Sequence, residues 1–213
     1  MDPIFAQMTD VIVSGLPDKA RELARQAVSS GIDPLEAIEK GFKPGMDIVG
    51  DGFTKGDLFI PDLVMSGEAM KAAIAVLEPE LVARGQRREV AGTVVIGTVK
   101  GDIHEIGKTL VGTMLAANGF EVHDLGVDIP ASAFVDAVRN TGANVVGLSA
   151  LLTTTLLNQE TVIHTLEEAG LRDRVKVIIG GVPASPEWAA EIGADGYAEN
   201  ATEAVTVERE LVG

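Results

Sequence analysis

Cysteine is absent from this chain of 213 residues, which excludes disulfide bonds and thiolate-bound metal ions. Histidine is scarce too, because His104, His123 and His164 are the only three in the sequence. Any metal that is bound through a ring nitrogen therefore has few candidate ligands.

Basic residues are also in deficit. Lys and Arg together number 17 against 32 Asp and Glu, which gives a formal net charge of −15. Nucleic acids and anionic membrane surfaces are both bound through lysines and arginines. We therefore expect no nucleic acid and no membrane among the partners. The charge suits docking against a basic face of another protein.

Long apolar runs are missing as well. No stretch reaches the roughly 18 uninterrupted apolar residues of a membrane span. The start, Met1-Asp2-Pro3, lacks the basic residues and the apolar run of a signal peptide, so we expect a cytoplasmic protein. Aromatic residues make up only 4% of a chain that is 46% hydrophobic, so the core must be aliphatic.

The first part of the chain carries apolar residues three or four positions apart, which is typical of amphipathic helices. Four such runs with short breaks between them predict a small antiparallel four-helix bundle. The runs are Ile4–Ile12, Leu16–Val28, Leu35–Met46 and Leu63–Leu77. The breaks are expected at Ser14-Gly15, Ser29–Gly31 and Gly50–Pro61.

A polar, basic stretch at residues 83–89 (ARGQRRE) interrupts the acidic background and predicts a domain boundary. We expect a helical domain over residues 1–86 and a second domain over residues 90–213. The second domain alternates β-branched apolar runs with helical patterns, which predicts a parallel sheet covered by helices on both faces. Five strands and five helices fit a doubly wound, flavodoxin-like fold.

The expected strands are Thr93–Val99, Glu121–Leu125, Val145–Ser149, Val175–Ile179 and Gly196–Ala198. The expected helices are His104–Ala117, Ala131–Thr141, Thr155–Ala169, Pro186–Ile192 and Ala201–Leu211. Ligands of such sheets bind beyond the carboxyl ends of the strands, so the residues that follow each strand are the candidates for a site.

The loop after the first strand has a purely structural interpretation. Asp102 and Glu105 are spaced as a capping box, and Gly101 and Gly107 permit a turn and close helix packing. His104 is then an ordinary residue of the first helical turn. Taken alone, the loop favours this interpretation.

The alternative is metal chemistry. An imidazole can bind a metal through one nitrogen and donate a hydrogen bond to a carboxylate through the other, and Asp102 stands two residues before His104. One histidine is too few for a free metal ion. It suffices as the protein ligand of a metal that is already held by a macrocycle, as in haem.

The pattern Asp102-x-His104-x-x-Gly107 resembles the signature of cobalamin-binding domains. The surrounding segment Thr98–Lys108 is most similar to methionine synthase and to the corrinoid proteins of methyltransferase systems. The resemblance implies a cobalamin or related corrinoid cofactor, methylcobalamin in the loaded state. His104 then replaces the cofactor's own dimethylbenzimidazole as lower axial ligand of cobalt, and the displaced nucleotide tail threads beside the sheet. By the same resemblance, Gly101 and Ile103 contact the cofactor.

The third strand is followed by a motif that matches the same family. Ser149 and Leu151 fit its Ser-x-Leu pattern, and the resemblance implies that Ser149 and Thr153 hydrogen-bond the buried base. Thr155 stands where a hydroxyl completes a relay with His104 and Asp102, although methionine synthase has serine there. A polar N-cap cluster explains this segment about as well.

The last two strand ends match more weakly. Gly180 and Gly181 correspond to the family's Gly-Gly pair, which lets a ring or a ribose approach the backbone. Taken by itself, the pair is better explained by a plain strand-to-loop turn. Asn200 falls where the family lines the nucleotide tail. The order of these motifs, each after an expected strand, carries more weight than any one of them.

The segment Val49–Val64 in the helical half resembles the cap of methionine synthase and related corrinoid proteins. The resemblance implies that Phe53 and Ile60, in the loop between two helices, cover the upper face of the corrin and exclude water. Both side chains could instead belong to the bundle core. Gly50, Gly52 and Gly56 are candidate hinges for cap movement.

The whole resemblance implies a corrinoid methyl carrier. Its cobalt takes a methyl group from a donor-specific methyltransferase and passes it to a second, acceptor methyltransferase, with a reductive activase as a possible further partner. His104 releases and rebinds the cobalt, while Asp102 and Thr155 manage the accompanying proton. No substrate site is evident in the sequence, so we expect no turnover without partner proteins.

Two other classes of function stay open at this stage. The chain could hold cobalamin for storage or sensing, or it could be a flavodoxin-like domain for another ligand. A receiver domain needs an aspartate at the end of the third strand, and this strand ends in Ser149.

Overall fold

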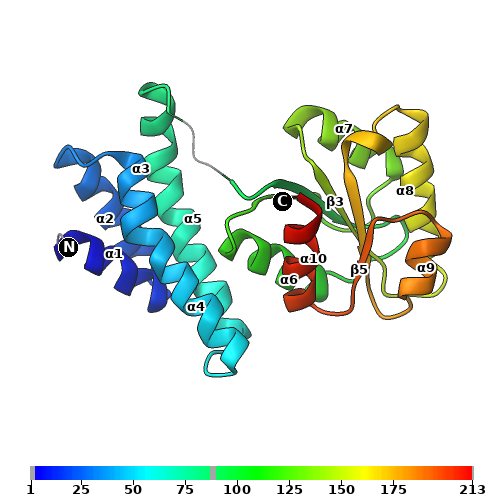
Figure 1. Cartoon of the computed structure of the whole chain (residues 1–213), viewed down its shortest axis with the longest axis horizontal. Helices are drawn as coiled ribbons and strands as arrows, with labels where there is room; N and C mark the ends of the chain where they lie inside the picture. The colour runs from blue at the N-terminus through cyan, green and yellow to red at the C-terminus, as the bar shows by residue number, and fades with distance from the viewer. Residues whose placement is uncertain (1–2, 87–89, 213) are drawn as a thin grey trace. The chain divides into compact units, whose positions relative to one another are not determined.

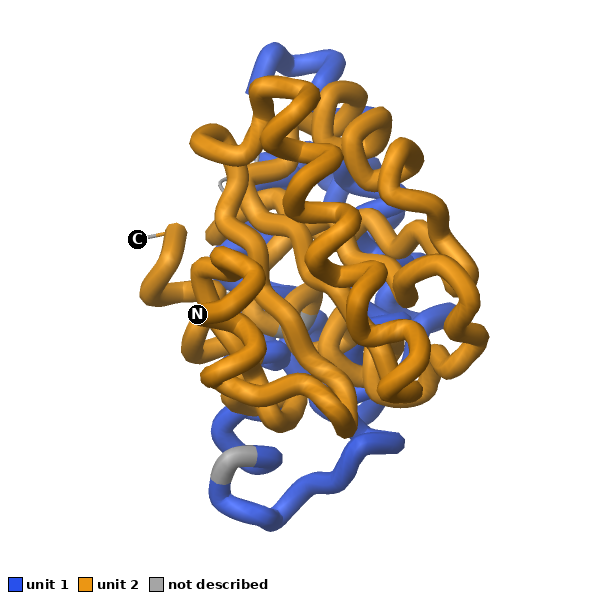
Figure 2. The backbone as a smooth tube through the Cα atoms, turned by 90° about the vertical axis from the view of Figure 1, so that its right-hand side faces the viewer, with its two compact units in different colours: residues 1–89 blue, residues 90–213 orange. Residues whose placement is uncertain are grey.

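The computed structural model describes residues 3–86 and 90–212. The chain divides into two compact units, Met1–Glu89 and Val90–Gly213, which are coloured separately in Figure 2. Of the expected linker, Ala83 is the last residue of a helix, and residues 87–89 lie outside the described part of the chain.

The first unit is helical, as predicted (Figure 1). Its elements are α1 (Pro3–Val13), α2 (Pro17–Ser29), α3 (Pro34–Glu36), the π-helical turn η1 (Ala37–Phe42), α4 (Lys43–Lys55) and α5 (Ile60–Ala83). Because α3, η1 and α4 follow one another without a break, they act as one helix, and residues 3–86 form a four-helix bundle. Its core includes the fully buried side chains of Met8, Ile12, Leu63 and Leu77.

The expected break over Gly50–Pro61 is too long. Helix α4 continues to Lys55 and ends at Gly56, whose φ of 79° is the left-handed conformation common after a helix. Glycine lowers helix propensity by about 1 kcal/mol relative to alanine, but packing overrides that preference here. A Cβ at Gly52 would come within 2.8 Å of the Leu58 side chain, so the helix and the following loop pack closely at this glycine. Gly50 and Gly52 are therefore helical residues rather than loop hinges.

The second unit is a five-stranded, all-parallel sheet in the order β2-β1-β3-β4-β5. The strands are β1 (Thr93–Thr98), β2 (Glu121–Asp124), β3 (Val145–Ser149), β4 (Lys176–Gly180) and β5 (Gly196–Ala198). The helices are α6 (Ile106–Ala117), α7 (Ala131–Thr141), α8 (Leu157–Glu168), the short turn η2 (Arg172–Arg174), α9 (Pro186–Glu191) and α10 (Ala201–Val212). This strand order is the flavodoxin-like one, so the predicted fold class is confirmed.

Helices cover both faces of the sheet (Figure 1). One face packs against α7, α8 and α9 through a continuous apolar core, in which Phe134, Ile163 and Ile179 are almost wholly buried. On the other face α10 packs against α6, β4 and β5. The β-branched runs of the sequence are thus strands with both faces covered.

Two helix starts differ from the prediction in a way that matters for the site. Helix α6 begins at Ile106 and α8 at Leu157, so His104 and Thr155 precede their helices. No helix within residues 3–86 and 90–212 is long and apolar enough to cross a membrane.

Candidate functional site

A buried carboxylate organises the carboxyl edge of the sheet. Asp102 is completely buried, in the loop between β1 and α6. Its Oδ1 accepts a hydrogen bond from the backbone amide of His104 (3.0 Å) and faces Nδ1 of the same residue at 2.7 Å. Its Oδ2 accepts from the backbone amides of Leu151 (2.7 Å) and Leu152 (3.3 Å) and from Oγ1 of Thr155 (2.8 Å). The loop after β1 and the loop after β3 are therefore joined through one side chain.

This network overturns the capping interpretation of the loop. Helix α6 starts after Glu105 without any side-chain cap, so the Asp102 carboxylate does not cap that helix. His104 instead lies in an irregular segment, where Thr98 Oγ1 donates a 2.8 Å hydrogen bond to its carbonyl oxygen. Thr98 is the last residue of β1, so the strand itself fixes the backbone of His104.

The loop after β2 supports the other end of the segment. Asp128, which has a positive φ of 56°, accepts a 2.7 Å hydrogen bond from the amide of Gly101. The amide of Asp128 donates in turn to the carbonyl of Asp102 (2.9 Å). Gly101 has a φ of 81°, which glycine adopts without strain. The turn that carries Asp102 is thus held from two neighbouring strands.

Hydrogen bonding decides the charge of Asp102. Burial raises its pKa, because a low-dielectric site disfavours the ionised form. The amides of His104 and Leu151, together with the His104 ring and the Thr155 hydroxyl, favour that form more strongly. Their sum holds the pKa of Asp102 well below the ordinary value of 3.8.

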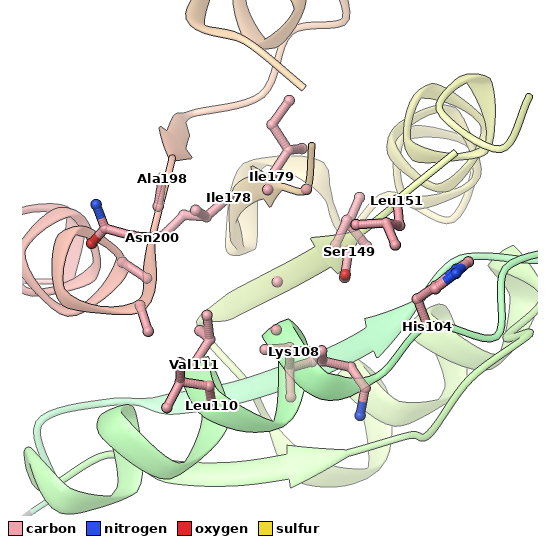
Figure 3. Close-up of a pocket in the computed structure, with 18 of the residues that line it drawn as sticks. His104, Lys108, Leu110, Val111, Ser149, Leu151, Ile178, Ile179, Ala198 and Asn200 are labelled. Carbon is pink, nitrogen blue, oxygen red and sulfur yellow. The ribbon is translucent and has the colours of Figure 1, made fainter. Parts of the chain in front are cut away.

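His104 is left with one free ring nitrogen. Its Nδ1 faces Asp102, and Nε2 makes no hydrogen bond with any residue that the structure describes. Its side chain is 46% exposed and borders a large pocket (Figure 3). A carboxylate at Nδ1 fixes the neutral ring with its lone pair on Nε2, which is the arrangement of a metal-binding histidine. The described residues contain no cluster of three His, Asp or Glu that would hold a free metal ion.

The pocket has a volume of about 770 Å³ and is mostly apolar. It lies between one face of the sheet and the helices α6 and α10. Figure 3 shows His104 on one side of it, Asn200 and Ala198 on the opposite side, and Lys108 and Val111 of α6 between them. Pockets of this size and character are typical of small-molecule and cofactor sites.

A glycine in the middle strand keeps the pocket open. Ile96, Gly147 and Ile178 are paired side by side on β1, β3 and β4, and all three line the pocket. A Cβ on Gly147 would approach Ile96 to 3.1 Å and would take up space above the sheet. Glycine inside a buried strand often marks such a close approach. That signal was available in the sequence, although Gly147 was not predicted as a site residue.

Most of the predicted cofactor-binding residues of the second unit meet at this pocket. Those that line it are Ile103, His104, Gly107, Ser149, Leu151, Gly180, Gly181 and Asn200. Three others do not line it: Asp102 is buried behind His104, while Gly101 and Thr153 are exposed in the loops. Thr155, which was predicted as a catalytic residue, is buried beside Asp102. A Cβ on Gly107 would meet nothing within 4 Å, so helix–strand packing does not explain this glycine.

Gly181 and Asn200, which matched the family pattern more weakly, also have structural roles. A Cβ on Gly181 would lie 1.8 Å from the carbonyl oxygen of Ala150, so the fold itself requires glycine there. The side-chain oxygen of Asn200 accepts from the amides of Thr202 and Glu203 and caps α10. Both residues also line the pocket, and the two roles are compatible.

The predicted cap residues belong to the first unit. Phe53 lies in the last turn of α4 and is half-buried, and Ile60 is the first residue of α5 and is 45% exposed. Neither is therefore a fully buried core residue. We expected both in the loop between two helices, but they lie at the helix ends on either side of it. Phe59, next to Ile60, is also exposed.

Two buried ionisable residues of the pocket were missed from the sequence. Lys108 is buried, and its Nζ pairs with both carboxylate oxygens of Asp124 at the end of β2. Glu208 of α10 is buried without a hydrogen-bond partner. Its position on the apolar stripe of its helix was the available signal, because Ala201, Ala204, Val205 and Glu208 recur at helical spacing.

Comparison with known proteins gives a consistent result. The B12 binding domain family matches residues 92–206, and a second B12 binding domain family matches residues 4–78. The dimethylamine corrinoid protein of Methanosarcina barkeri is 45% identical over 211 residues, which are 99% of this chain and 98% of that protein.

Two solved structures from the same organism extend the match. The monomethylamine corrinoid protein is 43% identical with a TM-score of 0.55, and the match covers 98% of both chains. The methanol:cobalamin methyltransferase complex MtaBC contains a chain that is 29% identical with a TM-score of 0.86, covering 100% of this chain and 85% of that one.

Proposed function

The chain belongs to the family of B12-binding corrinoid proteins, and from that premise we propose that it carries a methyl group on a corrinoid cobalt whose lower ligand is Nε2 of His104. The observation that carries the proposal is the buried Asp102, which occupies Nδ1 of His104 at 2.7 Å and leaves Nε2 free at the pocket. The corrinoid supplies the organometallic chemistry when bound, since its cobalt can accept and release a methyl group.

The residues present fit a corrinoid. His104, with a carboxylate behind it, would supply one protein ligand to the metal, and the 770 Å³ pocket beside it would have room for the nucleotide tail. Ser149 lines this pocket, and its hydroxyl makes no hydrogen bond with the described residues, so it is available to the base. Gly107 and Gly180 present backbone without side chains to the same space.

Asp102 and Thr155 act on His104 rather than on the methyl group. Because its hydrogen bonds lower the pKa of Asp102, the carboxylate would stay ionised beside the His104 ring and would not take a proton from it. The same carboxylate, 2.7 Å from Nδ1, would hold the ring in place with or without a bound metal. Thr155 Oγ1 also lies 2.9 Å from the carbonyl of Leu152, but it has one proton and the carboxylate is the stronger acceptor. Thr155 therefore positions Asp102.

The methyl donor belongs to the partner in this proposal. The relatives are named for dimethylamine and monomethylamine, and the related complex for methanol, although they share this fold. One carrier architecture thus serves several donors. We propose a donor-specific methyltransferase and an acceptor methyltransferase as partners, a reductive activase as a third, and a cytoplasmic location.

The cap role of Phe53 and Ile60 is part of the same proposal. Both are apolar and flank the short loop between α4 and α5, and neither is fully buried in the core of the bundle. An apolar cover excludes water from a reactive metal centre.

The test is the electron paramagnetic resonance spectrum of the full chain reconstituted with hydroxocobalamin and reduced to Co(II). Protein labelled with ¹⁵N is compared with unlabelled protein, so that a nitrogen from the protein changes the hyperfine splitting from a triplet to a doublet. We expect this change in the wild type and in His164→Ala, an exposed histidine on α8, and its loss in His104→Ala. A triplet in the labelled wild type means that the cofactor keeps its own base, and the proposed ligand is then wrong.

A further inference from the structure

Glu208 stands out among the pocket residues because nothing in the protein satisfies its carboxyl group. Its residue is 1% exposed, on the face of α10 that turns toward the sheet. Oε2 is buried without a partner, and the carboxyl group forms no hydrogen bond with any residue in the described ranges 3–86 and 90–212. Buried carboxyl groups are rarely left in this state, because an unsatisfied one costs about 1–3 kcal/mol or more.

The surroundings do not offset this cost. The other ionisable residues that line the pocket are His104, Glu105, Lys108, Tyr197 and Glu199. Lys108, the one ammonium among them, is already paired with Asp124. Burial raises the pKa of Glu208 to about 8, so the carboxyl group is largely neutral at pH 7 and can both donate and accept a hydrogen bond.

The position of Glu208 indicates which part of a ligand it meets. Helix α10 starts at Ala201, beside the carboxyl end of β5, and runs back along the sheet. Ala201 and Glu208 both line the pocket and lie two helical turns apart, which is roughly 10 Å. His104 lies at the carboxyl edge. A corrinoid with its cobalt at His104 therefore reaches Glu208 only with the far end of its nucleotide tail.

We propose that Glu208 selects among corrinoids by their lower base, favouring a base that carries a hydroxyl or amino group over one that carries only alkyl groups. This selection rests on the proposed function. A hydroxyl or amino group on the base satisfies the buried carboxyl group. An alkylated base seals the carboxyl group away from water and leaves it without a partner. Sites with a buried polar group reject ligands that lack the matching group far more strongly than apolar pockets reject a change of size.

The experiment measures the affinity of the full apo chain for three corrinoids by the change in their visible absorption. The probes are a hydroxybenzimidazolyl cobamide, cobalamin with its dimethylbenzimidazole base, and cobinamide, which has no base. We expect the wild type to bind the hydroxybenzimidazolyl form about tenfold more tightly than cobalamin. In Glu208→Met this preference disappears, and cobalamin binds more tightly than it does to the wild type.

Two further variants separate specificity from folding. Glu208→Gln keeps a donor and an acceptor at the same place, so part of the preference should survive. Glu210→Met changes an exposed glutamate of the same helix and should leave every affinity unchanged. Removing an unpaired buried carboxyl group raises stability, so Glu208→Met is expected to fold and to melt at a higher temperature than the wild type.

The outcomes distinguish the two proposals. Equal wild-type affinity for both cobamides, or an equal change for both in Glu208→Met, rejects the role of Glu208 and leaves the carrier function intact. If none of the three corrinoids binds, the carrier function and the selection fall together. If cobinamide binds as tightly as the cobamides, the tail does not occupy the pocket, and the selection is rejected.

Discussion

Two carboxyl groups are buried near the pocket, Asp102 behind His104 and Glu208 on α10, and they differ in hydrogen bonding. At the carboxyl edge, Asp102 has no exposed surface and receives hydrogen bonds from two loops and a histidine ring. On α10, Glu208 is buried to nearly the same degree and receives none. The pKa of Asp102 lies below its ordinary value, and that of Glu208 is raised to about 8.

Burial alone therefore does not set the charge of a carboxyl group here. Desolvation is the largest single influence on both residues and raises the pKa of both. What differs is the number of donors within reach. The loop after β3 directs the amides of Leu151 and Leu152 at Asp102, whereas Glu208 projects from the middle of a helix, where every neighbouring amide is already used. Loops can aim backbone donors at a side chain, and helix interiors cannot.

The largest effect expected from this difference is a pH dependence of stability that comes from Glu208. Its pKa is about 8 in the folded chain and near 4.5 in the unfolded chain, so the folded chain holds a proton that the unfolded chain has lost. Stability from this group is complete below pH 4.5 and is lost as the pH rises toward 8. The loss is on the order of 4 kcal/mol.

This loss can be isolated by subtraction. Trp188 is the only tryptophan and lies on α9, so its fluorescence reports unfolding of the α/β unit. Urea unfolding of the apo chain at pH 5 and pH 8 is compared with that of Glu208→Gln, which cannot titrate at this position. Other groups cancel in the difference, including His164, whose pKa is raised. A wild type and a variant that lose the same stability between the two pH values would show that Glu208 is ionised or solvated in the folded state.

The next effect in size is the removal of Asp102. In Asp102→Ala, the amides of Leu151, Leu152 and His104 lose their acceptor in a buried place. We expect the unfolding free energy of the α/β unit at pH 7 to fall by about 3 kcal/mol. Asp136→Ala, an exposed aspartate on α7, is the matched control and should change it by less than about 0.5 kcal/mol. A loss below about 1 kcal/mol for Asp102→Ala would mean that water replaces the carboxylate, and the site would not be the dry network described.

The fold could be predicted from the sequence because apolar patterns that extend over whole segments indicate its strands and helices. Strands covered on both faces read as apolar runs, and the predicted bounds of Val145–Ser149 and Gly196–Ala198 are confirmed. The errors lie where packing decides. Gly50 and Gly52 were predicted to lie in a loop, but α4 passes through both, and Leu58 packs closely against the helix at Gly52.

Only part of the candidate site could be predicted from the sequence. The grouping of Asp102, His104 and Thr155 came from a family resemblance, and the structure brings the three side chains together. The amides of Leu151 and Leu152 could not be predicted, because the direction of a backbone amide depends on the turn that carries it. Glu208 was not predicted as a site residue, although it lies in the expected helix Ala201–Leu211. Its helical spacing from Ala201, Ala204 and Val205 was a signal of burial, and the structure shows that this face of α10 turns toward the sheet.

The smallest expected effect is the loss of stability when Thr155, one of the donors to Asp102, is replaced. Thr155→Val keeps most of the side-chain shape and removes one of the donors to Asp102, so we expect a stability loss of about 1 kcal/mol at pH 7. Asp102 has a lowered pKa, so its contribution is present above its unfolded pKa of 3.8 and is lost as the pH falls. Losing a donor raises the folded pKa of Asp102, which shrinks that contribution.

Unfolding of wild type, Thr155→Val and Thr155→Ser is compared at pH 7 and at pH 3, where the contribution of Asp102 is reduced. Thr155→Ser restores the hydroxyl and should recover most of the loss, and the gap between Val and wild type should narrow at pH 3. A gap of the same size at both pH values would show that Thr155 contributes by packing alone, and that Asp102 is held ionised by the loop amides and His104 without it.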